Sequence, residues 1–386
     1  MSTKTEELLI KILRAVAVDC EADKACELLS KLTGDEMKSL FSLAQKHQLG
    51  HYVAYIMMTR GDERFSKPFY SAAGLTAKQQ VAVGEISEKL TARELEYIML
   101  KGVVLRRLYP EPWMRNSCDV DVFVKEEKLK EAEAVLEELG YEKKMGLEGM
   151  SAHDVQFDKN KVHVELHYAL IAENLYPKVD AVLSRVWSCS SADDGYQHFM
   201  TDEFFYFYHI AHMLKHFENG GFGVRPILDL WFLNNKCEFS KEKRDELLSE
   251  GGLLKFEREM VRLSQYWFSD GDGEGLETLV EYLLTGGAYG TTKNSVSLRK
   301  SKRGGRLSYF MSRIFAPYSL LRRYYPVLNK YPILLPFYEV KRWIDALRRD
   351  KTKYVRELRE NVRDDDALEK NDKMLTTLGL KENKGE

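Results

Sequence analysis

The chain has 386 residues, more than a single hydrophobic core usually holds, so we expect two or three domains. Its 58 basic and 60 acidic side chains give a formal net charge of -2, which excludes a polyanion-binding surface spread over the whole molecule. The five cysteines form no CxxC pair and the first residues lack the apolar core of a secretory leader, so we expect reduced thiols in a cytoplasmic protein. No segment approaches the ~20 apolar residues that a membrane-spanning helix needs.

The first part of the chain, residues 1–92, is predicted to be a helical domain. The segments TEELLIKILRAVAVD and DEMKSLFSLAQKHQ place apolar residues three and four positions apart, which is typical of amphipathic helices. A longer helical pattern follows from about Thr76 to Leu90.

Residues 93–175 have a different pattern from the helical residues before them, and this pattern predicts a small mixed sheet. ELEYIMLKG indicates a strand that stops at a glycine, DVDVFV alternates as a strand should, and KEEKLKEAEAVLEELG is an amphipathic helix capped by Gly140. Two further strands, HDVQFD and KVHVELHYAL, are joined by a turn at Lys159 and Asn160. We therefore expect an α/β (α+β) fold, in which a small mixed-sheet domain is embedded between helical domains.

The third predicted domain, residues 176–290, is helical and is expected to line the cleft of the sheet domain. His209, His212 and His216 share one helical face, which indicates helix packing or a substrate cleft more than a zinc site, because no nearby acid or thiol completes the ligand set. Arg225 and Asp229, four residues apart, are most simply an ion pair along a helix, and the alternative is that they line the cleft.

The last predicted domain, residues 291–386, is a basic and aromatic helical region with a charged tail. Residues 293–323 hold nine Lys or Arg and no acid, interleaved with aromatic side chains. Three interpretations of this stretch stay open: a solvated surface, a strip that binds RNA or another polyanion, and a patch that faces anionic lipid.

Two aspartates inside a buried strand are the most informative feature of the sequence. In DVDVFV, Asp119 and Asp121 project from the same side, and an ionised carboxylate is costly to bury without a partner. In KVHVELHYAL, His163, Glu165 and His167 likewise share one side. If the two strands are neighbours, three carboxylates meet at one edge and form an oxygen site suited to Mg²⁺ or Mn²⁺.

The segment before the DVDVFV strand supplies groups that suit a phosphate. LKG ends a strand and opens a helical turn, so backbone N–H groups near Gly102 are available to an anion, and glycine permits close approach. Lys101 and Arg115 add positive charge, and Arg115 falls in phase with the aspartates if the strand is regular that far back.

These elements together resemble the nucleotidyltransferase superfamily that includes DNA polymerase beta and the aminoglycoside nucleotidyltransferases. LKGVVLRRLYPEPWMRNSCDVDVFV, AEAVLEELGYE and VHVELHYAL look in particular like a family of uncharacterised bacterial nucleotidyltransferases, and HIAHMLKH and RPILDL are similar to its helical part. The resemblance implies that Asp119, Asp121 and Glu165 are the catalytic metal ligands, and that Glu165 also helps to deprotonate the acceptor. It implies that Gly102 is the phosphate-loop glycine, while Val103 replaces the second small residue of the superfamily motif.

The sequence therefore predicts an enzyme that moves a nucleoside monophosphate from an NTP to a hydroxyl-type acceptor, with two Mg²⁺ or Mn²⁺ ions. Lys101, Gly102, Arg115 and His167 are the candidate nucleotide-binding residues. Two alternatives stay open: a non-catalytic nucleotide-binding protein, favoured by Val103, and a DxD glycosyltransferase, disfavoured by the helical residues 1–92. The motifs do not distinguish among small-molecule, carbohydrate, RNA and protein acceptors.

Overall fold

The computed structural model describes the chain over residues 3–144, 153–171, 176–192, 195–302, 318, 321, 325, 327–349 and 366–381. The chain divides into two compact units: unit 1 consists of Met1–Met213 and Val224–Glu274, and unit 2 of Leu214–Gly223 and Gly275–Glu386. Helices and one mixed sheet make up the fold, so the predicted mixed α/β class is confirmed. The four-domain division expected from the sequence stays a prediction.

Five α-helices precede the sheet in unit 1, as the apolar spacing predicts: α1 (Lys4–Leu13), α2 (Ala22–Ser30), α3 (Gly34–Lys46), α4 (Gly50–Thr59) and α5 (Ser66–Ala92). Thr3 and Thr33 form capping boxes at the starts of α1 and α3, which satisfy backbone N–H groups that the helices leave free. Helix α5 begins well before Thr76, because Pro68 lies in its first turn, where a missing N–H costs little.

The sheet of unit 1 has seven strands in the order β3-β4-β5-β2-β1-β7-β6. The strands are β1 (Tyr97–Met99), β2 (Asp119–Val124), β3 (Glu142–Lys143), β4 (Asp154–Lys159), β5 (Val162–His167), β6 (Ser190–Ala192) and β7 (Gln197–Met200). Strand β2 runs antiparallel to β1 and parallel to β5, and β4 and β5 form a hairpin. The predicted neighbourhood of the two acidic strands, β2 and β5, is therefore confirmed.

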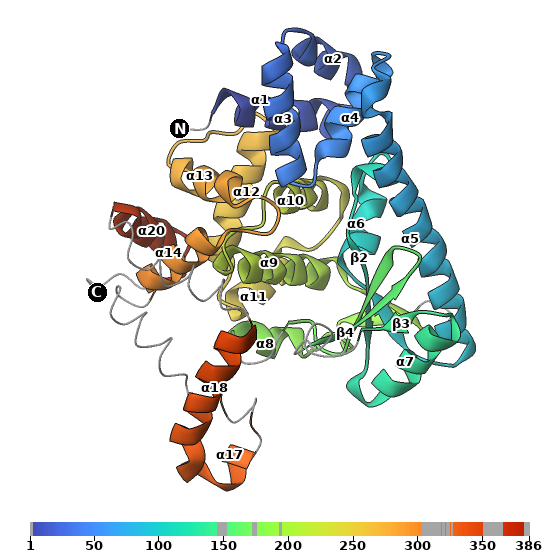
Figure 1. Cartoon of the computed structure of the whole chain (residues 1–386), viewed down its shortest axis with the longest axis vertical. Coiled ribbons are helices and arrows are strands. Elements are labelled where there is room, and N and C mark those ends of the chain that lie inside the picture. The colour runs from blue at the N-terminus through green and yellow to red at the C-terminus, as the bar shows by residue number, and fades with distance from the viewer. Residues whose placement is uncertain are drawn as a thin grey trace. The chain divides into compact units, whose positions relative to one another are not determined.

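One face of the sheet is apolar and lies against α5 and α7 (Leu129–Glu138), which Figure 1 shows beside the strands. Its residues alternate along the two central strands: Val120, Val122, Val124, Val162, Val164 and Leu166. Each fully buried aliphatic side chain contributes roughly 1.5–3 kcal/mol. A register slip of one residue would exchange this face for the acidic one, so the pleat fixes which way the acids point.

Local backbone geometry confirms one detail of the prediction and corrects another. Gly140, after α7, has a φ of 82°, so its predicted role as a left-handed helix cap is confirmed. The β4–β5 turn centres on Asn160 and Lys161, with φ values of 51° and 70°, one residue later than predicted. Two left-handed residues match the twist of a tight hairpin.

Strands β6 and β7 were not predicted from the sequence. Strand β7 pairs in parallel with β1, and β6 extends the sheet beyond β7. Their short, partly polar segments, SSA and QHFM, carry little strand signal, and their pairing with the distant strand β1 supplies what local propensity lacks.

The remaining helices of unit 1 are α6 (Lys101–Leu105), α8 (Pro177–Leu183), α9 (Asp202–Glu218) as far as Met213, α10 (Arg225–Lys236), α11 (Lys241–Glu250) and α12 (Leu254–Phe268). Helix α6 follows β1 directly, which places the LKG motif at a strand-to-helix junction as predicted. Aromatic side chains of α9 are buried, among them Phe204, Tyr206 and Tyr208.

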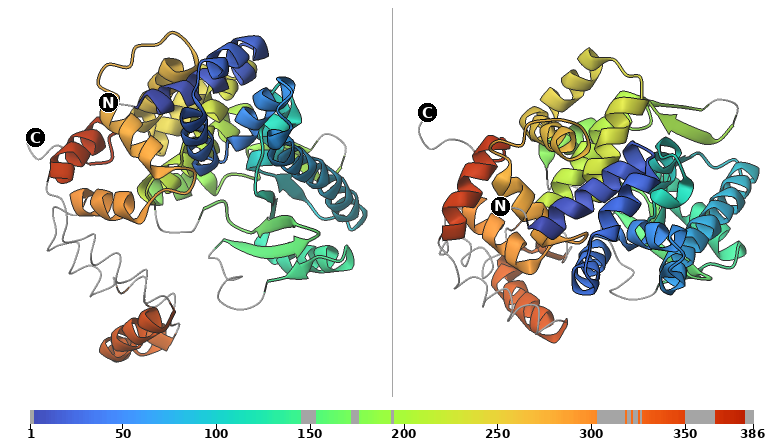
Figure 2. Two further views of the ribbon diagram at one scale, coloured as in Figure 1. Left: turned by 45° about the horizontal axis from the view of Figure 1, so that its top comes forward. Right: turned by 90° about the horizontal axis from the view of Figure 1, so that it is seen from above.

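Unit 2 contains α13 (Glu277–Gly286), α14 (Thr292–Lys302), α17 (Val327–Lys330), α18 (Leu335–Arg349) and α20 (Asp366–Thr377). Helices α14 and α20 lie side by side, as both views of Figure 2 show, and Asn371 donates a hydrogen bond to Ser297 across them. No helix in the described part of the chain is both long enough and apolar enough to cross a membrane.

The start of the basic stretch 293–323 is part of α14. Lys300 is only 1% exposed, and Lys302 forms an ion pair with Glu218. These two side chains therefore contribute to the packing of unit 2. Most of the stretch, including residues 303–317, lies outside the described residues. Its contact with a polyanion or a membrane surface therefore stays a prediction.

Candidate functional site

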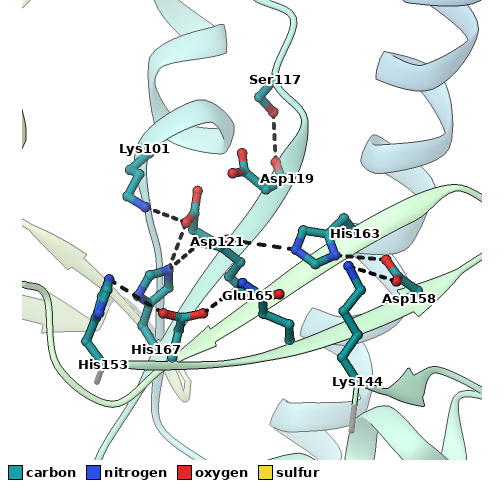
Figure 3. A network of polar contacts seen from close by, with 12 residues as sticks. Lys101, Ser117, Asp119, Asp121, Lys144, His153, Asp158, His163, Glu165 and His167 are labelled. Atoms are coloured by element: carbon teal, nitrogen blue, oxygen red, sulfur yellow. Dashed lines mark hydrogen bonds and ion pairs between the residues drawn. The ribbon is translucent and has the colours of Figure 1, made fainter. Parts of the chain in front are cut away.

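The acidic face of β2 and β5 brings two of the three predicted carboxylates together. Asp121 and Glu165 are direct register partners on the two parallel strands, and both side chains point away from the apolar core. Figure 3 shows them converging with His167, the residue two positions after Glu165 on β5. The predicted meeting of acids from separate chain segments is present in the structure.

His167 and Lys101 both hydrogen-bond the same oxygen of Asp121. His167 Nε2 lies 2.8 Å from Asp121 Oδ1 and 3.3 Å from Glu165 Oε2, while Lys101 Nζ donates to Asp121 Oδ1 at 2.6 Å. His167 and Asp121 are buried, and the side chain of Glu165 is 19% exposed. The cluster thus has a buried interior and one carboxylate that reaches solvent.

These contacts set the protonation of the cluster. Burial alone would raise the pKa of Asp121 and of Glu165, but the Lys101 charge and the histidine hydrogen bonds lower both pKa values below the ordinary range. Burial and the Lys101 charge oppose protonation of His167, yet its hydrogen bonds to the two acids raise its pKa. Both acids are therefore ionised at neutral pH.

Asp119 is placed differently from Asp121. It starts β2, its register partner is His163, and its backbone carbonyl accepts a hydrogen bond from Ser117 Oγ at 2.8 Å. Burial, reinforced by the charge of Asp121, raises the pKa of Asp119 to about 6. Its carboxylate lies on the same side of the strand as that of Asp121 (Figure 3).

Lys101 holds its contact from an uncommon backbone conformation. Its φ is 40°, in the left-handed region that non-glycine residues rarely occupy. Burial lowers the pKa of Lys101, but the charges of the nearby acids, Asp121 first, outweigh it and hold the pKa above its ordinary value. Strain of this kind concentrates at functional sites, where the surroundings enforce it.

Gly102 packs closely against Ser117. A Cβ atom at this position would lie 3.0 Å from both Cβ and Oγ of Ser117, which is closer than side chains normally pack. The next residue, Val103, turns its side chain toward the core of the sheet. The valine that departs from the superfamily motif therefore packs on the apolar side, away from the glycine contact.

Arg115 lies beside Gly102 but off the strand. Strand β2 begins only at Asp119, so the prediction that Arg115 shares the phase of the aspartates is wrong. Its Nε donates to Asp229 Oδ1 at 2.6 Å, and Tyr109 donates to the same oxygen at 2.7 Å. The Arg115 and Asp229 side chains are 7% and 1% exposed, so the guanidinium charge is already matched in a buried pair.

The helical residues singled out in the sequence have other partners than expected. Asp229 pairs with Arg115, so the predicted ion pair with Arg225 is wrong; Arg225 instead donates to Gln48 Oε1 and to the Asn116 carbonyl. His209 contacts the Pro226 carbonyl, and burial lowers its pKa.

The donor set can hold a divalent cation. Ligand atoms of Asp121, Glu165 and His167 all lie within 4.8 Å of one another, and two carboxylates with an imidazole suit Mn²⁺ as well as the oxygen-preferring Mg²⁺. Within the described residues, a second group shares His167 and adds His153 and Asp154, which the sequence did not single out. Asp154 is the register partner of His167 on β4, so the alternation of HDVQFD was the available signal.

The comparisons with known proteins give one match. A family of proteins described as "Uncharacterised nucleotidyltransferase" matches residues 33–269, more than half of the chain. This range contains the whole sheet and every residue of the acidic cluster. No curated protein and no solved structure matches the chain.

Proposed function

The chain belongs to the family of uncharacterised nucleotidyltransferases, and from this premise we propose a metal-dependent transfer of a nucleoside monophosphate from an NTP to a hydroxyl-type acceptor. The observation that carries the proposal is the convergence of Asp121, Glu165 and His167 from neighbouring parallel strands. Carboxylates at this spacing repel one another unless a cation lies between them.

Asp119, Asp121 and Glu165 would hold the metal ions, with His167 as a further donor. Mg²⁺ or Mn²⁺ bound there supplies the charge that neutralises the pyrophosphate leaving group. Glu165 suits the role of a ligand because the neighbouring imidazoles of His163 and His167 and the Lys101 charge keep its pKa low. Glu165 would also help to deprotonate the attacking hydroxyl.

Lys101 and Gly102 would help to bind the nucleotide. In the structure the Lys101 ammonium neutralises Asp121, so a cation bound to the acids would free it for a phosphate oxygen. Gly102 is the second residue of α6 and would let the backbone of this turn approach a phosphate closely. Arg115 would support this turn through its pair with Asp229.

The test is transfer of label from α-³²P-NTPs in the presence of Mg²⁺ or Mn²⁺ and a cell lysate. We expect label to enter an acceptor and pyrophosphate to be released, and the double variant Asp119→Asn with Asp121→Asn to abolish both. Asp158→Asn is the matched control, because this carboxylate bonds His163 but lies outside the three-ligand group. Undiminished transfer by the double variant would overturn the proposal.

A non-catalytic nucleotide-binding protein is the second candidate, and Val103 is the feature that favours it. The packing of Val103 against the apolar core weakens that case, since its side chain does not crowd the glycine. Metal-dependent NTP binding without pyrophosphate release would favour the binding protein.

A further inference from the structure

A cavity of about 310 Å³ adjoins the start of β2 in unit 1. Its walls come from the end of α3, the start of α4, the first half of α5, Arg225 of α10 and the segment 116–118. That segment leads directly into Asp119, so the cavity and the acidic cluster share one stretch of backbone. A volume of this size is at the lower end of what small-molecule sites occupy.

Two of the residues that line the cavity have a buried polar atom without a hydrogen-bond partner among the described residues. Asn116 Oδ1 and Arg225 Nε are buried and have no hydrogen-bond partner among the described residues. The Gln45 amide lies directly over Gly50, where a Cβ would be within 2.4 Å of its Oε1. Buried polar atoms without partners are uncommon in folded proteins and indicate a missing ligand or solvent.

Arg225 gives the cavity its charge. It is the only Lys, Arg, Asp or Glu among the lining residues, and His51 is neutral at pH 7 because burial lowers its pKa to about 4. The guanidinium donates to two neutral oxygens, and no carboxylate lies within ion-pair distance of it among the described residues. Burial lowers the pKa of Arg225, and the charges of Asp229 and Asp119, which lie beyond ion-pair distance, offset this only in part, so the guanidinium favours an anionic ligand.

Part of the lining is apolar and comes from α5, with Pro68, Ala72 and Leu75. One cation, amide groups and an aliphatic wall suit an organic molecule with a single anionic group. A triphosphate carries more negative charge than one guanidinium can match, and Lys101 with the acid-bound cations is the better place for it. A polymer such as RNA would need a strip of cations rather than one.

We propose that this cavity binds the acceptor, and that the acceptor is a small hydroxyl-bearing organic molecule whose one carboxylate or phosphate ester sits on Arg225. This inference rests on the proposed nucleotidyl transfer. In the reaction, the acceptor hydroxyl oxygen bonds to the α-phosphorus, and the bond from that phosphorus to the bridging oxygen breaks. Pyrophosphate leaves with the electron pair, and the hydroxyl proton passes to Glu165.

Cys118 allows the charge preference of the cavity to be measured without knowing the acceptor. It lines the cavity and is exposed, as is Cys20, which lies elsewhere in the chain. The two thiols are alkylated with iodoacetate and with iodoacetamide, an anionic and a neutral reagent of nearly equal size, and quantified by peptide mass spectrometry. The rate ratio of the two reagents cancels the intrinsic reactivity of each thiol.

We expect Arg225→Gln to lower the iodoacetate-to-iodoacetamide ratio at Cys118 by about fivefold, the effect of one nearby charge in water, and to leave the ratio at Cys20 unchanged. Arg225→Lys, which keeps the charge, should retain most of the ratio at Cys118. An equal ratio at Cys118 in wild type and Arg225→Gln overturns the anion site.

Transfer of label then separates the inference from the proposed function. Protein-free metabolite extract is divided by anion exchange into neutral and anionic fractions, and each is incubated with enzyme, α-³²P-NTP and Mn²⁺. We expect label in the anionic fraction, reduced at least tenfold by Arg225→Gln. Label confined to the neutral fraction or to macromolecules overturns the acceptor assignment but keeps the transferase. Absence of transfer to every fraction and to lysate overturns both.

Discussion

Lys101 Nζ lies 2.6 Å from Asp121 Oδ1, and the lysine reaches it from a backbone φ of 40°. The strained turn after β1 thus delivers a cation to the acid at the centre of the cluster. Because Asp121 is 1% exposed, its charge would be costly without that partner. The fold therefore places a positive charge beside the acid cluster even without a bound metal.

Removing this cation should destabilise the metal-free protein. Among the described residues, Lys101→Met leaves the buried Asp121 carboxylate with His167 as its remaining hydrogen-bond partner, and we expect the free energy of unfolding to fall by about 3 kcal/mol. Urea unfolding in the presence of EDTA measures this loss of unfolding free energy. Added Mn²⁺ should recover more stability in the variant than in wild type, since the ion takes over the charge of the lysine.

Lys128→Met is the control for that change. Lys128 forms an exposed pair with Glu131 one helical turn away, and such pairs contribute little. Equal stability of both variants and wild type would contradict a structural role for the Lys101 contact.

Gly102→Ala should damage both the fold and nucleotide transfer. The new Cβ would meet Ser117 at 3.0 Å, and the neighbour it displaces leads into Asp119. We expect a loss of roughly 1–3 kcal/mol in unfolding free energy, as for other overpacked sites, and a higher KM for NTP.

Gly84→Ala is the matched control for Gly102→Ala. Gly84 is exposed within α5, and nothing lies within 4 Å of the added Cβ. This variant should gain about 0.5–1 kcal/mol in unfolding free energy, because alanine is the better helix former. A neutral Gly102→Ala would show that the contact with Ser117 yields easily.

Arg115 is expected to act mainly on stability. Arg115→Met leaves the Asp229 charge buried, so the free energy of unfolding should fall by about 3–5 kcal/mol. The double variant Arg115→Met with Asp229→Leu removes both charges and should recover part of the loss, which a double-mutant cycle measures. A large rise in KM for NTP with unchanged stability would instead assign Arg115 to the nucleotide.

His51 should make stability depend on pH. Burial, with help from the Arg225 charge, lowers its pKa from 6.5 to about 4 despite a hydrogen bond to the Met114 carbonyl. As pH falls below 6.5 the unfolded state takes up a proton that the folded state refuses until about pH 4. Stability should therefore fall across this window, by about 3 kcal/mol from this group.

The variant His51→Gln isolates that contribution. Its unfolding free energy, measured by urea between pH 7 and pH 4, should depend less steeply on pH than that of wild type. Parallel pH profiles for the two proteins would show that His51 titrates normally in the folded chain.

The alternation of apolar and polar residues was sufficient to predict the central strands of the sheet and their acidic face. Alternation in DVDVFV and KVHVELHYAL identifies which side of each strand is apolar, and burying six aliphatic side chains on one face forces Asp121 and Glu165 onto the other. The side of the sheet on which each side chain lies can be predicted locally, because successive side chains of a strand alternate between the two faces whatever the partner strand is.

Long-range partners could not be predicted in the same way. The pairing of β7 with β1 and the ion pair between Arg115 and Asp229 join segments about a hundred residues apart, and neither carries a local signal. Arg225 and Asp229 are four residues apart, and this spacing predicted an ion pair between them. In the structure, Asp229 pairs instead with Arg115, a buried arginine from another segment. The cavity at Arg225 likewise exists only once α3, α5 and α10 are assembled.

Binding of Mn²⁺, followed by isothermal titration calorimetry, tests the acid cluster most directly. Outer-shell partners of bound metals already change affinity by about 10–100-fold. Asp121→Asn and Glu165→Gln should therefore each weaken Mn²⁺ binding by at least about 100-fold, whereas Asp158→Asn should bind as wild type does. Equal Mn²⁺ affinity in wild type, Asp121→Asn and Glu165→Gln would contradict a metal site between β2 and β5.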